Sequence, residues 1–279
     1  MAEYYINRKW VDAEQAAISL HDAGFLRGDG IFETVALEGG GLFRLDDHLE
    51  RMFQGLKMIR IRSNESQGEI AELVREYVRR NSLREAVIRI IITRGIYTGM
   101  PWEHTGLNSI YITHKAPSQL PDPPAKIVYL DETKYPLIRR HPAVKSLNYL
   151  GNMLAKMDAQ EAGAFEPVMY NADGYITEGG IRNIFYVREG TVLTPPTSLG
   201  ILPGTMRDAV IEVARREDIP VEETLIRREE VDTMDEAFIT STGIKILPVT
   251  WNNWNGDFVV TSVLSSTLNT FIKEERTVV

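Results

Sequence analysis

The sequence predicts a two-domain α+β protein with a small N-terminal α/β domain and a larger C-terminal domain. The chain has 279 residues, which is enough for two domains of ordinary size. The segment from Lys115 to Pro124 contains four prolines and is typical of an extended linker. Strands and helices are predicted on both sides of it. We therefore place the small domain at 1–116, the linker at 117–124 and the large domain at 125–279.

The elements of the small domain follow from the spacing of its apolar residues. Strands are expected at 4–6, 31–37, 86–93 and 109–114, where apolar and β-branched residues gather between turn residues. Helices are expected over 45–59 and 70–78, because apolar residues recur there at intervals of three and four. The glycines at 39–41 predict a tight turn after the second strand.

The large domain is predicted to begin with a strand at 126–130, followed by a helix from about 147 to 162. Short strands are expected at 168–170, 175–177, 184–187 and 192–193, separated by turn residues at 171–174 and 189–190. A further helix is expected from Pro203 to Arg216, since proline is well tolerated in the first turn of a helix.

Composition and patterning argue against several classes of function. The net charge of -8, without a basic stripe, disfavours binding to nucleic acid. The longest apolar runs are too short to span a membrane, and the N-terminus lacks the pattern of a signal peptide. The absence of cysteine fits a reducing cytoplasm, where we expect the protein. The five histidines have no metal-site spacing, so no metal is expected.

Lys145 is the first residue that suggests chemistry. It stands in HPAVKSLNYLGNMLAK, and its neighbours Ala143, Val144 and Leu147 are apolar. A lysine nucleophile must lose its proton, and partial burial favours the neutral amine. Taken alone, however, such a residue is more often a solvated lysine at the start of a helix.

Three later segments supply groups that would complement this lysine. YITEG places Glu178 between a strand and two glycines, where a carboxylate could face the ring nitrogen of a pyridine cofactor. LPGTMRD leads into a helix N-terminus, which favours a phosphate group. FITSTG sets Ser241 and Thr242 in a loop after a strand, where hydroxyl groups can donate hydrogen bonds.

These motifs, K-x-x-N-Y, Y-I-T-E-G and L-P-G-x-x-R-D, together with GFLRGDGIFET and FRLDDHLERM, resemble the fold-type IV pyridoxal-phosphate enzymes. That family includes branched-chain aminotransferases, D-amino-acid aminotransferases and aminodeoxychorismate lyases. The resemblance implies a large domain with a barrel-like sheet, pyridoxal 5'-phosphate as cofactor, and a homodimer with the site near its interface.

The resemblance also implies roles for individual residues. Lys145 would bind the cofactor as a Schiff base and move the proton of the 1,3-shift, and Glu178 would pair with the pyridine nitrogen. Tyr149 would hydrogen-bond the ring hydroxyl, from a position on the same helical face as Lys145. The phosphate would be bound by Arg51, by the backbone of Thr205 and Met206, and by Thr242.

The substrate is less clearly indicated, because no standard signature of the family fits. Val87 stands where branched-chain enzymes have a tyrosine, Arg27 stands where they have an aromatic residue, and the Arg-x-His of the better-known D-amino-acid enzymes is missing after Thr93-Arg94-Gly95. Guanidinium groups bind carboxylates bidentately, and an unpaired charge is costly in an apolar pocket. We therefore expect Arg27, Arg182 and, as a third candidate, Arg89 to bind substrate carboxylates.

This pattern leads to the hypothesis of a D-amino-acid transaminase that uses D-glutamate or D-alanine with 2-oxoglutarate. Local pairing of Arg182 with an acid such as Asp173, a solvent-facing or cross-dimer Arg27, and a surface position for Arg89 are the simpler interpretations. The alternatives for function are a branched-chain L-amino-acid transaminase, an aminodeoxychorismate lyase and a non-catalytic cofactor-binding protein.

Overall fold

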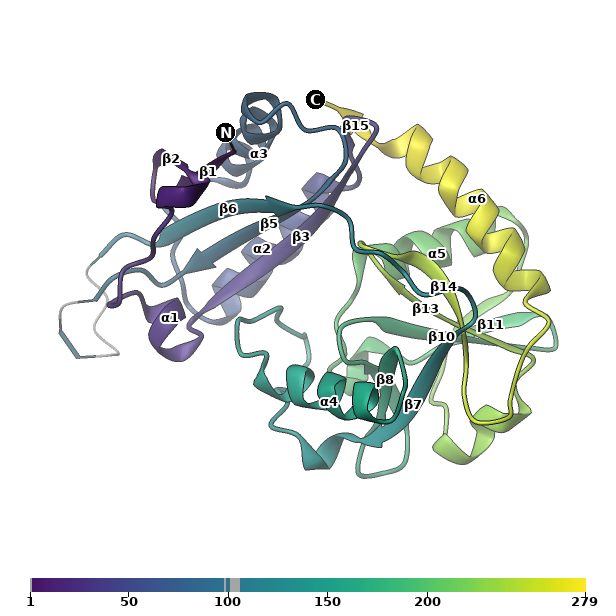
Figure 1. The fold of residues 1–279 in the computed structure, drawn as a ribbon. Coiled ribbons are helices and arrows are strands. Elements are labelled where there is room, and N and C mark those ends of the chain that lie inside the picture. Colours follow the sequence, from purple (N-terminus) through teal and green to yellow (C-terminus); the bar gives the residue numbers. More distant parts are fainter. Residues whose placement is uncertain (1, 98, 101–105) are drawn as a thin grey trace. The chain divides into compact units, whose positions relative to one another are not determined.

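The computed structural model describes residues 2–97, 99–100 and 106–279 (Figure 1). The chain forms two compact units. Unit 1 contains residues up to 118 together with 144–148 and 275–279, and unit 2 contains 119–143 and 149–274. The first change of unit falls inside the proline-rich segment. The short segment 144–148, which carries Lys145, belongs to unit 1, although a contiguous two-domain division puts it in the second domain.

Unit 1 is built on a seven-stranded antiparallel sheet with the order β15-β4-β3-β5-β6-β1-β2. Its long central strands β3, β5 and β6 occupy the places where the sequence predicts strands. The strands are β1 (Glu3–Ile6), β2 (Lys9–Asp12), β3 (Gly30–Glu38), β4 (Gly41–Leu42), β5 (Ala86–Thr93), β6 (Ser109–Lys115) and β15 (Thr277–Val278).

Two helices, α2 (Leu45–Met58) and α3 (Gln67–Arg80), pack on one face of this sheet (Figure 1). The core between them consists of alternate residues of the central strands, such as Ile88, Ile90 and Ile92, and of the apolar side of the helices. The opposite face of the sheet carries Phe32, Arg89 and Tyr111. The short helix α1 (Ala23–Arg27) is tied to this second face, and a 3-10 turn, η1 (Ala13–Gln15), precedes it.

Unit 2 contains an eight-stranded mixed sheet with the order β12-β11-β10-β13-β14-β7-β8-β9. The sheet is curled (Figure 1), which agrees with the barrel-like sheet implied by the resemblance, and the predicted fold class is confirmed. The strands are β7 (Ala125–Asp131), β8 (Glu166–Tyr170), β9 (Ile176–Gly179), β10 (Asn183–Arg188), β11 (Thr191–Thr194), β12 (Val221–Glu223), β13 (Glu236–Ser241) and β14 (Lys245–Thr250).

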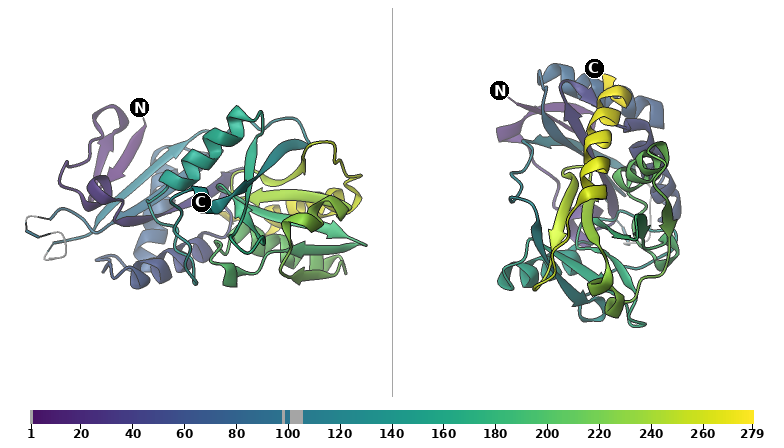
Figure 2. Two further views of the ribbon diagram at one scale, coloured as in Figure 1. Left: turned by 90° about the horizontal axis from the view of Figure 1, so that it is seen from below. Right: turned by 90° about the vertical axis from the view of Figure 1, so that its right-hand side faces the viewer.

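Three helices accompany this sheet: α4 (Leu150–Glu161), α5 (Thr205–Arg216) and α6 (Val259–Glu275). The carboxylate of Glu236 on β13 caps α6 by accepting the N–H groups of Val260 and Thr261, both at 2.8 Å. Further along α6, the yellow helix in Figure 2, Phe271 contacts the guanidinium of Arg216 on α5. Shorter 3-10 turns are η2 (Glu132–Lys134), η3 (Thr197–Leu199) and η4 (Arg228–Thr233). Among the described residues, no helix has the length and apolar character required to cross a membrane.

Candidate active site

Lys145 is held in unit 1 by backbone pairing rather than by a helix. Its carbonyl oxygen accepts the N–H of Phe32 at 3.0 Å, and the N–H of Leu147 donates to the carbonyl of Gly30, also at 3.0 Å. The segment 144–148 therefore lies along the first residues of β3. The side chain is half buried, and its Nζ lies 4.7 Å from the centre of the Phe32 ring. The amine thus has a fixed place over an aromatic side chain.

This arrangement corrects one expectation. Tyr149 is not on the same helical face as Lys145, because α4 begins only at Leu150 and the lysine lies outside it. Tyr149 is instead the residue that precedes the helix, and it is half buried in unit 2. The apolar spacing after Lys145 suggested an earlier helix start, but pairing with β3 keeps residues 144–148 out of the helix.

Arg89 lies on the same face of the unit 1 sheet as Phe32. Phe32 pairs with Ile91, so Arg89 is its diagonal neighbour on β5. The guanidinium carbon of Arg89 lies 4.8 Å from the centre of the Phe32 ring, and the side chain is exposed. Since Lys145 contacts the same ring, two cationic groups gather at one aromatic residue.

Helix α1, which ends at Arg27, is fastened to the same face of the sheet by the buried carboxylate of Asp22. Asp22, 1% exposed, caps α1 by accepting the N–H of Gly24 at 2.8 Å, and it also accepts the hydroxyl groups of Tyr111 (2.8 Å) and Thr93 (3.0 Å). Asp22 thereby fastens α1 to strands β5 and β6. Arg27, the last residue of α1, is exposed; it donates to the hydroxyl of Tyr97 at 2.5 Å and stacks on that ring.

Arg51 belongs to a buried cluster on the helix side of β3. Its guanidinium donates to both carboxylate oxygens of Glu33, at 2.8 and 2.7 Å, and Glu33 also contacts Nδ1 of His48 at 2.8 Å. Burial alone would raise the pKa of Glu33, but Arg51 and His48 hold it well below its usual range. Burial lowers the pKa of His48, whose Nδ1 lies against the same carboxylate that binds Arg51. The cluster fixes the direction of the Arg51 guanidinium.

In unit 2, Glu178 lies on β9 and is held by three donors. One carboxylate oxygen contacts Nη1 of Arg139, and the other accepts the N–H of Leu202 at 3.1 Å and a weak contact from Asn183 at 3.5 Å. Asn183 is fixed in turn by donating to the carbonyl of Leu202 at 2.9 Å. These contacts stabilise an ionised carboxylate, which is the form that can pair with a protonated ring nitrogen.

Arg139 is a site residue that sequence reasoning missed. Besides Glu178 it binds Glu132, whose carboxylate accepts Nε at 3.0 Å and Nη2 at 2.9 Å, and the same oxygen accepts the hydroxyl of Thr177 at 2.9 Å. Burial alone would lower the pKa of Arg139, but the two carboxylates raise it. No local pattern distinguishes Arg139 from the adjacent Arg140, so the sequence held no signal for its role.

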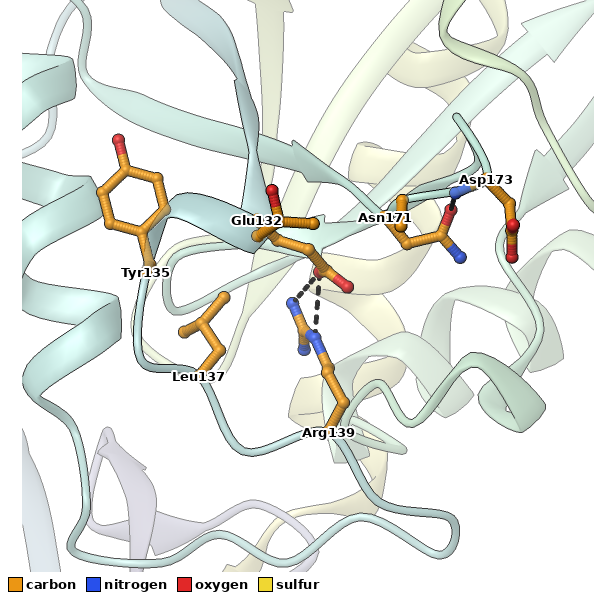
Figure 3. Close-up of a pocket in the computed structure, with 8 residues that line it drawn as sticks. Glu132, Tyr135, Leu137, Arg139, Asn171 and Asp173 are labelled. Carbon is orange, nitrogen blue, oxygen red and sulfur yellow. Dashed lines mark hydrogen bonds and ion pairs between the residues drawn. The ribbon is translucent and has the colours of Figure 1, made fainter.

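A pocket of about 320 Å³ opens beside this ion pair (Figure 3). Figure 3 shows the Glu132–Arg139 contact on one side and Asp173 on the other. Arg139 therefore lines the pocket while its guanidinium also reaches Glu178.

The predicted phosphate-binding segment forms the N-terminus of α5. Thr205 and Met206 begin this helix and are buried, so their N–H groups belong to the first turn, which has no intrahelical acceptors. Gly204 precedes them in close contact with Asn183: a Cβ at Gly204 would come within 2.2 Å of the Asn183 side-chain oxygen. Thr242 lies half buried in the turn after β13.

Thr240 is a second residue that the sequence did not single out. It pairs with Asn183 across β10 and β13, and its buried hydroxyl has no hydrogen-bond partner within the described part of the chain. A buried hydroxyl normally finds a partner, so this group is available to a ligand. It belongs to the FITSTG motif, two positions before Thr242.

The guanidinium of Arg182 forms an ion pair within unit 2. Its guanidinium contacts the carboxylate of Glu166, which is completely buried, and Lys156 binds the same carboxylate at 2.8 Å. Both cations also lie over the ring of Phe165, at 4.6 and 4.4 Å. The simpler interpretation, local pairing, therefore describes this residue, although its partner is Glu166 and not Asp173.

Known proteins share this organisation. A family model described as amino-transferase class IV matches residues 30–251. A Methanocaldococcus jannaschii protein described as a branched-chain-amino-acid aminotransferase is 37% identical over 88% of this chain and 86% of its own length. The D-alanine aminotransferase of Bacillus licheniformis is 30% identical over the same shares of the two chains. The solved branched-chain amino acid aminotransferase of Escherichia coli superposes with a TM-score of 0.86 at 26% identity, covering 98% of this chain and 94% of its own.

The chain belongs to the class IV aminotransferases. The resemblance seen in the sequence is thereby confirmed, and so are the reaction class and the cofactor, since class IV aminotransferases use pyridoxal 5'-phosphate. When bound, this cofactor supplies an electron sink that makes the Cα–H bond of an amino acid breakable.

The donor set of this aminotransferase fits the cofactor. An aldehyde requires an amine, a pyridinium requires a carboxylate, and a phosphate requires N–H groups, hydroxyl groups or guanidinium groups. Unit 1 offers Lys145 and Arg51. Unit 2 offers Glu178, the first turn of α5 and the unpartnered hydroxyl of Thr240. Each type of group that the cofactor needs is therefore present among the described residues.

Proposed function

We propose that this class IV aminotransferase transfers the amino group of D-amino acids, chiefly D-glutamate and D-alanine, to 2-oxo acids such as 2-oxoglutarate. The observation that carries the carboxylate part of the proposal is the shared contact of Lys145 and Arg89 with Phe32, at 4.7 and 4.8 Å, while the D hand is supported by the relatives described as D-alanine aminotransferases. A substrate whose amino group reaches Lys145 would then meet a guanidinium at the same aromatic side chain.

Two arginines support a carboxylate-rich substrate. Arg27 and Arg89 each lie against an aromatic ring, and neither has a carboxylate partner within the described residues. An arginine held over a ring keeps its directional N–H donors for a planar anion. Both lie on the face of the sheet to which α1 is fastened. A donor and acceptor pair such as D-glutamate and 2-oxoglutarate would supply carboxylates for both.

We do not include Arg182 with Arg27 and Arg89 among the arginines proposed to bind substrate carboxylates. Its charge is balanced by the buried Glu166, so binding a substrate anion would compete with an internal ion pair.

The roles proposed for the other residues follow the resemblance. Lys145 would hold the cofactor and, once displaced by the amino acid, its amine would move the proton from Cα to the cofactor. Glu178 would keep the ring nitrogen protonated. The phosphate would be bound by the N–H groups of Thr205 and Met206 and by Thr242, and Tyr149 would bind the ring hydroxyl. Arg51 would also bind the phosphate, but it would have to divide its guanidinium between the phosphate and the buried Glu33.

A branched-chain L-amino-acid transaminase is the second candidate. The relative of 37% identity carries that description and favours it, whereas the D-alanine aminotransferases reach 30%. The two candidate functions differ in the substrate groups that Arg27 and Arg89 would contact. A branched-chain amino acid has one carboxylate, as D-alanine does, so the second arginine favours D-glutamate in particular; beside a branched-chain substrate it would face an aliphatic side chain at a cost in binding.

The test is the absorbance of the purified holoenzyme on mixing with single amino acids. Loss of the yellow colour with D-glutamate or D-alanine, and not with L-leucine or L-valine, supports the proposal. Rapid loss with L-leucine and none with D-amino acids replaces it by the branched-chain function. Arg27→Ala and Arg89→Ala should raise the KM for D-glutamate at least tenfold, while Arg79→Ala, an exposed arginine on α3, should leave it unchanged.

We also propose a homodimer. Helix α4 exposes apolar side chains at intervals of three and four residues, a stripe that water solvates poorly. The stripe consists of Leu150, Met153, Leu154 and Met157, exposed by 65%, 41%, 38% and 55%. A second copy of the chain would cover it. Light scattering should give the mass of a dimer for the wild type and of a monomer for the double variant Leu150→Glu/Met157→Glu. A monomeric wild type would remove this part of the proposal.

A further inference from the structure

The guanidinium of Arg139 binds two carboxylates, that of Glu178 and that of Glu132. One guanidinium nitrogen contacts Glu178, while Nε and Nη2 bind Glu132 at 3.0 and 2.9 Å. All three side chains are largely buried: 13% of Glu178, 12% of Glu132 and 20% of Arg139 is exposed. Two negative charges and one positive charge are therefore confined together, so these three side chains sum to one negative charge.

The second carboxylate affects how strongly Glu178 can pair with a pyridinium. A carboxylate that alone neutralised a guanidinium would be a weak partner for a pyridinium, because an adjacent cation lowers the proton affinity of the carboxylate. Glu132 supplies a competing anion for Arg139. It thereby leaves Glu178 with more negative charge to present to a ring nitrogen.

Glu132 also fixes the strand that carries Glu178. The oxygen that binds Arg139 accepts the hydroxyl of Thr177 at 2.9 Å, and Thr177 is the neighbour of Glu178 on β9. Glu132 itself begins η2, the turn that follows β7. One carboxylate therefore connects the arginine to the backbone on which Glu178 is mounted.

We propose that Glu132 is a positioning residue that sets the charge Glu178 presents to the ring nitrogen of the cofactor. The proposal rests on the pairing of Glu178 with that nitrogen, which belongs to the proposed function. Glu132 touches neither cofactor nor substrate in this scheme and acts through Arg139.

The experiment measures cofactor binding to the apoenzyme by calorimetry, without turnover. Two ligands are compared: pyridoxamine 5'-phosphate and its 1-deaza analogue, in which carbon replaces the ring nitrogen. Glu132→Gln should weaken binding of pyridoxamine 5'-phosphate about threefold to tenfold and leave the analogue unchanged, since only the former places a positive charge at Glu178. Glu132→Asp, which keeps the charge, should restore part of the loss.

The control is Asp173→Asn. Asp173 lines the same pocket and is exposed, and removing its charge should change either Kd by less than about twofold because solvent screens it. Equal weakening of both ligands by Glu132→Gln would show a merely structural role and overturn the proposal. Wild-type affinities in Glu132→Gln would overturn it as well.

The variant Glu178→Gln distinguishes a wrong role for Glu132 from a wrong pairing of Glu178 with the ring nitrogen. If this variant discriminates between the ligands and Glu132→Gln does not, the role of Glu132 is wrong and the pairing of Glu178 stands. If Glu178→Gln fails to discriminate, the pairing itself is wrong and the proposal falls with it.

Discussion

Replacing Glu166 with glutamine would take away the carboxylate that Lys156 and Arg182 share. Glu166 is completely buried; it accepts the Ile181 N–H at 3.0 Å and Lys156 Nζ at 2.8 Å, and it contacts the Arg182 guanidinium. Breaking a buried ion pair by removing one partner costs about 3–5 kcal/mol. Since the Lys156 side chain is 19% exposed and can regain water, we expect the lower end, about 3 kcal/mol. For a unit of this size that corresponds to a fall in Tm of about 6–12 °C.

The assay is thermal unfolding of the holoenzyme at a fixed cofactor concentration. Glu212→Gln, which removes one partner of an exposed pair with Arg216 on α5, is the control and should lower Tm by no more than about 2 °C. The double variant Glu166→Gln/Arg182→Met should recover part of the loss, because it no longer buries an unpaired guanidinium. A shift for Glu166→Gln no larger than that of the control would refute this account. Arg182→Met with an unchanged Tm and a raised KM would return Arg182 to the substrate site.

Three further predictions concern single substitutions. The pKa of Glu33 is held below its ordinary value of 4.5, so the stability that Glu33 contributes is complete above that pH and is lost as the pH falls below it. The difference in unfolding free energy between wild type and Glu33→Gln should therefore shrink from pH 5 to pH 3. A constant difference would contradict this reasoning. Gly24→Ala would set a Cβ 2.3 Å from the methyl group of Thr93 and displace α1; the KM for D-glutamate should rise as it does in Arg27→Ala, and an unchanged KM would separate α1 from substrate binding. Gly204→Ala would push Asn183 away from Glu178; equilibrium dialysis should find the cofactor bound at least tenfold more weakly, whereas wild-type affinity would show that the α5 entrance tolerates the methyl group.

The elements that the sequence predicted well are those whose pattern is local. Strand β5 and helix α5 fall within two residues of their predicted bounds, because alternation and three-to-four spacing are properties of a single segment. The curled sheet and the cofactor came from the family resemblance and not from periodicity. Strand β12 has only three residues, and β14 contains Pro248, a residue that disfavours a strand; neither strand was predicted.

The misplacements have tertiary causes. Residues 144–148 continue the helical spacing of α4 toward the N-terminus, yet pairing with β3 draws them into unit 1 and delays the start of α4 to Leu150. Arg139 and Glu132 act through contacts with a strand some forty positions later, which no window of sequence reveals. Asp22 likewise looks like an ordinary turn residue until Tyr111 and Thr93 are found bonded to it.

The arginines of this chain differ in what balances their charge, and that difference bears on substrate choice. Arg182 has Glu166 as its internal carboxylate, so its charge is already balanced in the folded protein. Arg89 has an aromatic ring, Phe32, and within the described residues no carboxylate. Sequence alone treats both as candidate anchors, because the partner that distinguishes them lies elsewhere in the chain. An arginine held by a ring loses little on meeting a substrate anion, whereas one held by a buried carboxylate must first break an ion pair. A carboxylate brought to Lys145 is therefore expected to be bound by Arg89, whatever the hand of the amino acid that carries it.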